Sequence, residues 1–258
     1  MSTSDLAILT THDRVARLTL NRPESRNALS LELLGALHAR VDELTLRATR
    51  PSPVPAPHVL VVTGAGKVFC AGMDLKAVLG NAAQSRALLA SLADLTLKLR
   101  RLPLVSLAVV NGAAIGGGCG LSTVCDLSIT HADSKMGFPE VDLGVCPAVV
   151  APWLCRKIGV SAARRILLMG GLMTGMEAHL AGIVTQIVPT RADLDDAAET
   201  IVKRLAGGAP GAIAATKGLL NELDGSLDEA TLKRAAALSA DVLSTDEAQA
   251  MLRAKLGA

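Results

Sequence analysis

The sequence predicts an α/β protein: a core in which strands, small-residue turns and helices alternate, followed by a region of helices alone. Two apolar runs, 58–63 and 104–110, are typical of buried strands, and each leads through a glycine-centred turn into a helix-like segment. After about residue 195 only helical periodicity remains. We therefore expect a core over residues 1–195 and an all-helical region over residues 196–258.

Local patterns define the first elements of the core. Residues 6–9 and 15–20 have the apolar spacing of strands. Ser30 is a typical N-cap for a helix whose leucines recur at helical spacing up to Leu44. The proline-rich stretch 51–57 excludes a helix and predicts a stiff, exposed connector that is too short to separate two domains.

The same periodicities define the rest of the chain. Further strands are predicted over 126–130 and 183–188, and a glycine pair at 170–171 ends one of the helices. The predicted helices cover 87–101, 121–125, 152–158, 162–169, 176–181, 194–205, 210–223, 230–243 and 247–255.

Composition argues against two classes of partner. The 26 basic and 24 acidic residues leave a net charge of +2, which is too balanced for nucleic-acid binding. Base stacking needs aromatic rings, and this chain has only Phe69, Phe138 and Trp153. The sequence has no apolar run of about 18 residues, so we expect no membrane span. It also has no basic segment followed by a long apolar one near residue 1, so we expect no signal peptide. We expect neither a nucleic-acid nor a membrane partner.

The five cysteines indicate a reduced, cytoplasmic protein. Their number is odd and no CxxC motif occurs, which is typical of buried free thiols rather than of disulfides or zinc ligands. The five histidines are scattered without the spacing of metal ligands, so no metal site is expected.

Several common catalytic motifs are absent or incomplete. Residues 64–69 match neither a phosphate-binding loop nor a dinucleotide fingerprint. No GxSxG sequence occurs, and no histidine is placed by sequence to serve Ser122. Cys119 lies at the predicted start of a helix, where a thiolate is favoured, but we interpret it as a small residue packed beneath the turn.

The two glycine-centred turns, 69–75 and 111–120, predict a different chemistry. A strand that ends in a turn of small residues leaves backbone N–H groups without partners, and two such turns facing each other form an oxyanion hole. Glu140 lies among apolar and turn residues; in a pocket, its carboxyl group would have a raised pKa and transfer protons near neutral pH. The alternative is an exposed Pro-Glu turn. If the segment is extended, Glu140 and Asp142 share one face.

Four segments, in this order and at these spacings, resemble the crotonase (enoyl-CoA hydratase/isomerase) superfamily along nearly the whole chain. Residues 18–29 are similar to its N-terminal signature, 61–75 and 111–118 to its two oxyanion-hole segments, and 139–147 to its acid/base segment. The resemblance implies a spiral of ββα units with a C-terminal helical region that forms trimers, often paired into hexamers. It also implies an acyl-CoA thioester substrate and an enolate anion, with no cofactor beyond the coenzyme A of the substrate.

The resemblance also implies roles for single residues. The backbone N–H groups of Ala71 and Gly117 would hold the thioester oxygen, aided by the dipole of the helix that begins near Gly117, and Glu140 would act as acid and base. The residues expected to bind the acyl-CoA are Arg26, Ala28, Ala71, Gly72, Met73, Asp74, Leu75, Gly116, Gly117, Gly120, Pro139, Leu143 and Lys255.

The sequence departs from the family pattern at two places. Family hydratases use two glutamates, and Gly120 stands where the second would be, so it transfers no proton. After Pro147, the residues 148–150 are Ala-Val-Val in place of a glycine-rich stretch. These bulkier side chains predict a short or branched acyl group.

Three interpretations of the missing glutamate remain open. One glutamate suffices for a 1,3-proton shift, as in the family's enoyl-CoA isomerases. Alternatively, Glu140 hydrates the double bond together with a bound water or with Asp142; bacterial methylglutaconyl-CoA hydratases, whose sequence is similar to 147–152, also carry a small residue at the position of Gly120. In the third interpretation the protein binds acyl-CoA without turning it over. We favour the hydratase.

Overall fold

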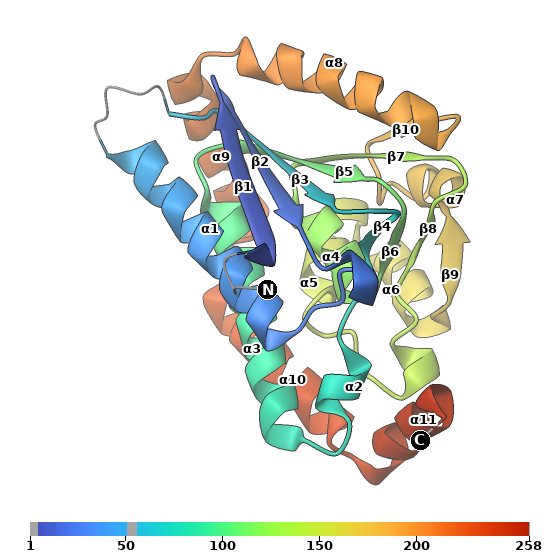
Figure 1. Ribbon diagram of the computed structural model, residues 1–258. Helices are drawn as coiled ribbons and strands as arrows, with labels where there is room; N and C mark the ends of the chain where they lie inside the picture. Colours follow the sequence, from blue (N-terminus) through green and yellow to red (C-terminus); the bar gives the residue numbers. More distant parts are fainter. Residues whose placement is uncertain (1–4, 51–55, 258) are drawn as a thin grey trace.

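Two β-sheets organise the part of the chain that the structure describes, residues 5–50 and 56–257 of a computed structural model (Figure 1). In the larger sheet, the first two strands are antiparallel and all other neighbours are parallel. Its strand order is β1 (Ala7–His12), β2 (Val15–Leu20), β3 (Val59–Gly64), β5 (Val105–Val110), β7 (Leu127–His131) and β10 (Gln186–Val188).

Both faces of the larger sheet are covered, which explains the continuous apolar runs of β3 and β5. On one face, Val61 and Leu107 pack against helix α8 (Leu194–Ala206), which crosses the sheet in Figure 1. On the other face, Leu60 and Val62 belong to the main hydrophobic core.

The smaller sheet was not predicted, because its three-residue strands are too short to show a period. Its strand order is β4 (Val68–Cys70), β6 (Ala113–Ile115), β8 (Lys135–Gly137) and β9 (Leu172–Thr174). The strands β4 and β6 lie within or beside the two glycine-centred turns, and they pair in parallel, with Cys70 opposite Ala114. This pairing brings the two turns side by side.

Helix caps explain where the first long helices begin. Helix α1 (Leu31–Thr49) starts after the predicted cap, because Ser30 Oγ accepts a hydrogen bond from Leu33 N at 3.3 Å. Helix α3 (Ala82–Arg101) starts earlier than the predicted residue 87, because the Asn81 side chain accepts from Gln84 N at 3.0 Å.

The C-terminal region is helical, as predicted, and it packs on the core: α10 lies along α3, and α3 along α1 (Figure 1). The boundary at residue 195 remains a prediction. The other helices are α2 (Leu75–Val78), α4 (Gly117–Val124), α5 (Ala151–Ile158), α6 (Val160–Met169), α7 (Gly175–Leu180), α9 (Pro210–Leu223), α10 (Glu229–Leu243) and α11 (Asp246–Leu256), with 3-10 turns η2 (Pro23–Ser25), η3 (Val141–Leu143) and η4 (Arg191–Asp193).

Several predicted boundaries were wrong. The first strand extends to His12, and the last strand begins at Gln186 rather than at 183. Helix α4 begins at Gly117, where the glycine-centred turn was expected to lead into a helix. The predicted connector over 51–57 lies largely outside the described residues.

Two buried asparagine side chains hold the loop between β3 and β4. Asn27 Nδ2 donates to three backbone carbonyls of the segment 65–69, at 3.0, 2.8 and 3.2 Å. Asn111 Nδ2 donates to two carbonyls of the segment 64–66, at 2.8 and 3.0 Å. The end of this loop, where the first glycine-centred turn begins, therefore has a fixed position.

We expect Asn27→Ala to lower the free energy of unfolding by about 2–4 kcal/mol, because it leaves buried carbonyl groups without a donor. Alanine is also less favourable than asparagine in the left-handed conformation of this residue, whose φ is 54°. Urea unfolding measures the loss. The control is Asn81→Ala, which removes an exposed N-cap and should lose about 1 kcal/mol. Equal losses in the two variants would contradict this role for Asn27.

Candidate active site

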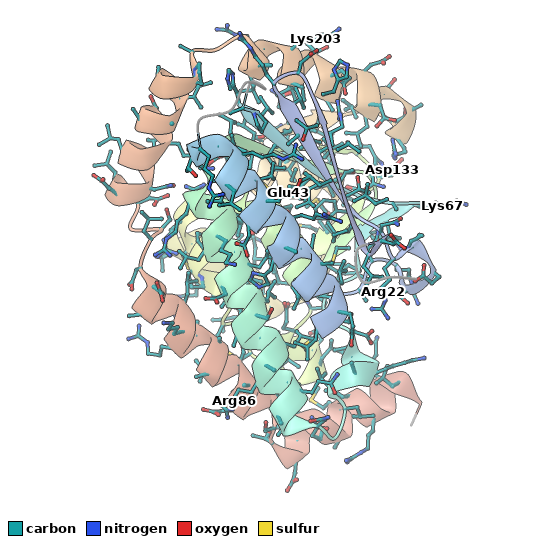
Figure 2. All side chains as sticks on the ribbon, turned by 60° about the vertical axis from the view of Figure 1, so that its left-hand side comes forward. Arg22, Glu43, Lys67, Arg86, Asp133 and Lys203 are labelled. Atoms are coloured by element: carbon teal, nitrogen blue, oxygen red, sulfur yellow. The ribbon has the colours of Figure 1, made fainter. Side chains whose placement is uncertain are left out.

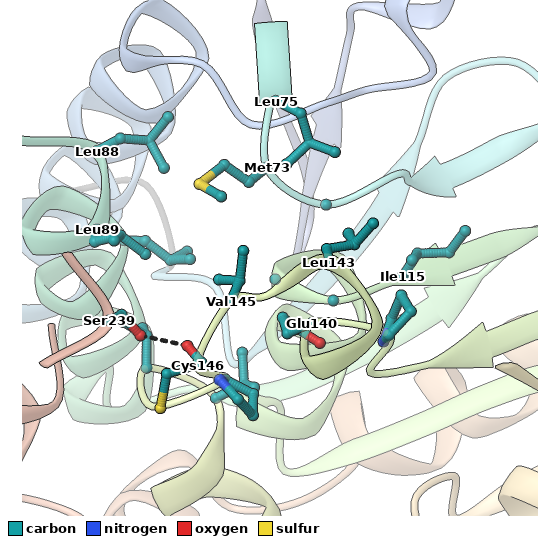
Figure 3. Close-up of a pocket in the computed structure, with 18 of the residues that line it drawn as sticks. Met73, Leu75, Leu88, Leu89, Ile115, Glu140, Leu143, Val145, Cys146 and Ser239 are labelled. Carbon is teal, nitrogen blue, oxygen red and sulfur yellow. Dashed lines mark hydrogen bonds between the residues drawn. The ribbon is translucent and has the colours of Figure 1, made fainter. Parts of the chain in front are cut away.

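A largely apolar cavity of about 80 Å³ lies beside the paired turns (Figure 3). Among the described residues that line it, Glu140 carries the only carboxylate, and Cys146 and Ser239 are the other polar side chains. The apolar wall consists of Ala71, Met73, Leu75, Leu88, Leu89, Leu92, Ile115, Pro139, Leu143, Val145, Pro147, Val149 and Val150.

Glu140 has a helical backbone conformation, with φ −59° and ψ −42°, at the start of η3. The extended segment considered from the sequence is therefore wrong, because Gly144 closes a 3-10 turn here by donating from its N–H to Val141 O at 3.2 Å. Asp142 is exposed, and its carboxylate accepts a hydrogen bond from Gly171 N at 2.8 Å. It does not line the cavity, so the pairing of Glu140 with Asp142 is also wrong.

The Glu140 carboxyl group is held in a poorly solvated place. Its Oε2 atom is buried and has no hydrogen-bond partner among the described residues. Burial raises the pKa of Glu140 to about 7, against a smaller lowering by a backbone hydrogen bond. Both the acid and its conjugate base are then populated near neutral pH, as proton transfer in either direction requires.

The prediction that the Ala71 backbone N–H is an oxyanion donor is wrong. Its backbone N–H donates to the carbonyl oxygen of Arg26 at 3.0 Å, so it is already occupied. Arg26 has a left-handed backbone conformation, with φ 53°, at the end of η2. The sequence did not reveal that conformation. It accompanies the hydrogen bond between the Arg26 carbonyl and the N–H of Ala71, the residue directly after β4.

Within the described part of the chain, the backbone N–H groups of Met73 and Gly117, which both line the cavity, have no hydrogen-bond partner. Met73 is flanked by bonded groups, since Gly72 O accepts from Leu29 N at 2.7 Å and Asp74 N donates to Leu29 O at 3.0 Å. Its own N–H has no partner among the described residues, and neither has that of Gly117 at the first position of α4.

The backbones of the two turns touch, so glycine is required where they meet. A Cβ atom on Gly72, whose φ is +87°, would lie 2.7 Å from Ile115 O and 3.7 Å from Gly117 N. A Cβ atom on Gly116, whose φ is +53°, would lie 2.9 Å from Glu140 Oε1. The free N–H groups and the carboxyl group therefore belong to one small site.

Gly120 does not line the cavity, because Val150 lies against it. A Cβ atom at residue 120 would come within 2.4 Å of Val150 Cγ1. In the sequence, Gly120 and the valines at 149 and 150 are two separate departures from the family pattern. In the structure they are one feature, in which a valine side chain packs where a side chain at position 120 would begin.

The remaining predicted binding residues lie outside the cavity wall. Arg26 and Lys255 are exposed. Asp74 forms an ion pair with Arg22, whose Nη1 lies 3.1 Å from Asp74 Oδ2 and 3.2 Å from the carbonyl oxygen of Ala28 (Arg22 is labelled in Figure 2). Arg22 was missed because an arginine in an N-terminal turn resembles ordinary surface charge.

Sequence reasoning also missed the α3 and α10 sides of the cavity. Leu88, Leu89 and Leu92 follow helical spacing and are indistinguishable from core residues in the sequence. Ser239 donates from Oγ to the Cys146 carbonyl at 2.6 Å (Figure 3) and accepts from Ala148 N at 3.2 Å. Its only signal is a hydroxyl at an apolar helix position.

The other chemical groups considered from the sequence do not contribute to this site. Burial raises the pKa of Cys119 to about 12, which fits a packed thiol rather than a nucleophile. All five cysteines are free. The described residues contain no cluster of potential metal ligands, and none of their helices is long and apolar enough to cross a membrane.

Comparison with known proteins assigns the chain to a family. The family model described as enoyl-CoA hydratase/isomerase matches residues 10–255. The 2,3-dehydroadipyl-CoA hydratase of Escherichia coli is 34% identical over 83% of this chain and 81% of that protein. Similar solved structures include AtuE of Pseudomonas aeruginosa, with 36% identity, a TM-score of 0.78 and coverage of 94% and 93% of the two chains. An enoyl-CoA hydratase from Mycobacterium avium has 29% identity, a TM-score of 0.85 and coverage of 98% and 96%. The chain therefore belongs to the enoyl-CoA hydratase/isomerase family and has the crotonase fold.

Proposed function

We propose that this enzyme hydrates the double bond of a short or branched enoyl-CoA, with Glu140 as its only proton-transferring side chain. The observation that carries the proposal is the buried Glu140 carboxyl group, which lines the same small cavity as two unpartnered backbone N–H groups. A thioester carbonyl bound by those N–H groups presents its α-carbon to the cavity.

We infer that the N–H groups of Met73 and Gly117 hold the thioester oxygen. Negative charge develops on that oxygen when the thioester becomes an enolate, and each preorganised donor typically stabilises it by about 2.7–4 kcal/mol. Gly117 is also the first residue of α4, so the positive end of the helix dipole lies at the same place.

Hydration requires one proton to leave a water molecule and one to reach the α-carbon. The Glu140 carboxylate accepts the proton as the water oxygen bonds to the β-carbon, and the resulting carboxylic acid then protonates the enolate at the α-carbon. One carboxyl group thus completes the cycle and ends in its starting state. A pKa of about 7 suits both half-steps.

The acyl group is proposed to be short or branched because bulky valine side chains line the cavity wall after Glu140. Val149 and Val150 are buried side chains of that wall, and Val150 packs directly on α4 at Gly120. The similar Escherichia coli enzyme is named as a 2,3-dehydroadipyl-CoA hydratase. Its name supports hydration as the reaction, and it does not support the choice of a short or branched acyl group.

The second candidate is an enoyl-CoA isomerase. The lack of a second carboxylate among the described wall residues favours it, because a 1,3-proton shift needs only one base. Binding of acyl-CoA without turnover is the remaining alternative. It predicts no change of any enoyl-CoA.

Assembly and location are part of the same proposal. The family resemblance implies a homotrimer or a dimer of trimers, formed through the C-terminal helical region. The helices α6 and α7 and the strand between them expose a further group of large apolar side chains, which favours contact with another subunit. Its members are Val160, Leu168, Met169, Leu172, Met176 and Leu180. The free thiols favour the cytoplasm.

Glu140→Gln should lower kcat/KM for enoyl-CoA hydration by about 10²–10⁴-fold while leaving CoA binding intact, because the amide transfers no proton. Asp142→Asn is the matched control and should keep its activity, since Asp142 does not line the cavity. Reaction in deuterated water, followed by mass spectrometry, identifies the chemistry. Gain of water with label at the α-carbon supports the hydratase; a moved double bond without added water identifies the isomerase and contradicts the hydratase.

The same variant should change how stability depends on pH. Glu140 has a raised pKa in the folded protein, so the folded state keeps a proton that the unfolded chain has released between about pH 4.5 and about pH 7. The wild type should therefore lose up to about 3 kcal/mol of unfolding free energy relative to Glu140→Gln as the pH rises through this window. Urea unfolding at pH 4 and pH 8 measures the difference, and a constant difference would argue that Glu140 is solvated.

Val150→Ala should widen the acyl pocket. We expect the ratio of kcat/KM for a long enoyl-CoA to that for crotonyl-CoA to rise about tenfold, because the wall beyond Glu140 retreats. Leu46→Ala, at an exposed position on α1, should leave the ratio unchanged. A wild-type enzyme that already prefers the long substrate would overturn the proposed short or branched acyl group.

A further inference from the structure

A second cavity, of about 190 Å³, lies where the C-terminal ends of α3 and α4 meet α5 and the turn after α9. It shares no lining residue with the active-site cavity. Three cationic side chains, Arg100, Arg156 and Lys157, line it together with two carboxylates, Asp126 and Asp224. The charges that have no ion-pair partner determine what this cavity can bind.

Both carboxylates are engaged by cations other than Arg156 and Lys157. Asp126 pairs with Arg100 at 3.1 Å and with the buried Lys217 at 2.8 Å. Asp224 pairs with the other guanidinium nitrogen of Arg100 at 2.8 Å. These ion pairs occupy Arg100 and both carboxylates. Among the described residues, they do not include Arg156 or Lys157, the two cations of α5.

Among the described residues, the hydrogen-bond acceptors of Arg156 and Lys157 are neutral carbonyl groups. Arg156 donates from Nε to the Asp224 carbonyl at 3.2 Å and from Nη2 to the Gly225 carbonyl at 2.7 Å. Lys157 Nζ donates to the Cys125 carbonyl at 3.2 Å. Within the described part of the chain, neither cation has a carboxylate at ion-pair distance. The Arg156 Nη1 atom is buried and has no hydrogen-bond partner there.

A third donor of the cavity wall is also unsatisfied. Trp153 is 3% exposed, and its indole Nε1 is buried without a hydrogen-bond partner among the described residues. The Arg156 guanidinium lies over the indole ring, 5.3 Å from its centroid. Buried donors without acceptors are rare in native proteins and are usually satisfied by a bound water or ion. Here Trp153, Arg156 and Lys157 line one cavity. All three are hydrogen-bond donors, and an acceptor with negative charge suits the two cations best.

We propose that this cavity binds a small oxyanion, namely a phosphate or carboxylate group, through Trp153, Arg156 and Lys157. Charge-assisted hydrogen bonds from guanidinium and ammonium groups suit both kinds of group. The bound anion neutralises the two cations of α5 and accepts hydrogen bonds from the donors that now lack partners. This site is separate from the acyl-CoA site and does not depend on which reaction the enzyme catalyses.

The chain contains its own probe for this site, because Trp153 is its only tryptophan and it has no tyrosine. Inorganic phosphate and sodium acetate are titrated in parallel into the full-length protein, with sodium chloride keeping the ionic strength constant, and tryptophan emission is recorded. We expect a saturable change in emission with at least one of the two anions. The anion that saturates identifies the phosphate or the carboxylate class.

Lys157→Met should weaken the binding about tenfold or more, because it removes one charge while keeping the aliphatic stem. Lys203→Met, on the exposed face of α8 (Figure 2), is the matched control and should bind as the wild type does. Thermal unfolding of the wild type gives a readout that needs no variant, since a ligand that binds only the folded state raises Tm. The binding anion should raise Tm above the value in chloride at equal ionic strength.

Three results would overturn the proposal. The first is an emission change that is linear or identical in chloride, which indicates a general salt effect. The second is equal affinity in Lys157→Met and Lys203→Met. The third is a Tm that does not differ between phosphate, acetate and chloride.

Discussion

The parallel pairing of β4 with β6 is the constraint on which the rest of the site depends. It places two chain reversals against each other so closely that a Cβ atom on Gly72 would collide with the Ile115 carbonyl. Side chains are excluded from the space between the two turns, and among the described residues the N–H groups of Met73 and Gly117 have no partner. We propose that these two groups bind an oxygen atom. The Asn27 and Asn111 side chains hold the loop that leads into it.

Desolvation provides the second half of the chemistry. The cavity wall is built largely from apolar side chains of α3, β6 and the segment after Glu140, and Glu140 Oε2 has no hydrogen-bond partner among the described residues. Burial is therefore the main cause that raises the pKa of this carboxyl group toward neutrality. A second carboxylate at position 120 would change this balance, but Val150 occupies the space that it would need. Among the described residues of the wall, Glu140 carries the only carboxyl group.

Much of this was predictable from the sequence because it rests on local patterns. The apolar runs of β3 and β5, the Ser30 cap of α1 and the two glycine-centred turns all have local signals. The identity of the free N–H group was not predictable. Arg26 has a left-handed conformation, and its carbonyl oxygen accepts a hydrogen bond from the Ala71 N–H. Among the described residues, the Met73 N–H has no partner. Likewise, the contact of Val150 with Gly120 joins residues 30 positions apart, and no local pattern reports it.

We propose that the backbones of Met73 and Gly117 bind one oxygen atom of a thioester. The most direct test is a crystal structure of the enzyme with a non-reactive acyl-CoA analogue. We expect the thioester oxygen to lie about 2.7–3.1 Å from both backbone nitrogens, with the Glu140 carboxyl group beside the α-carbon. A thioester oxygen that is bonded to neither nitrogen, or that faces away from Glu140, would contradict it.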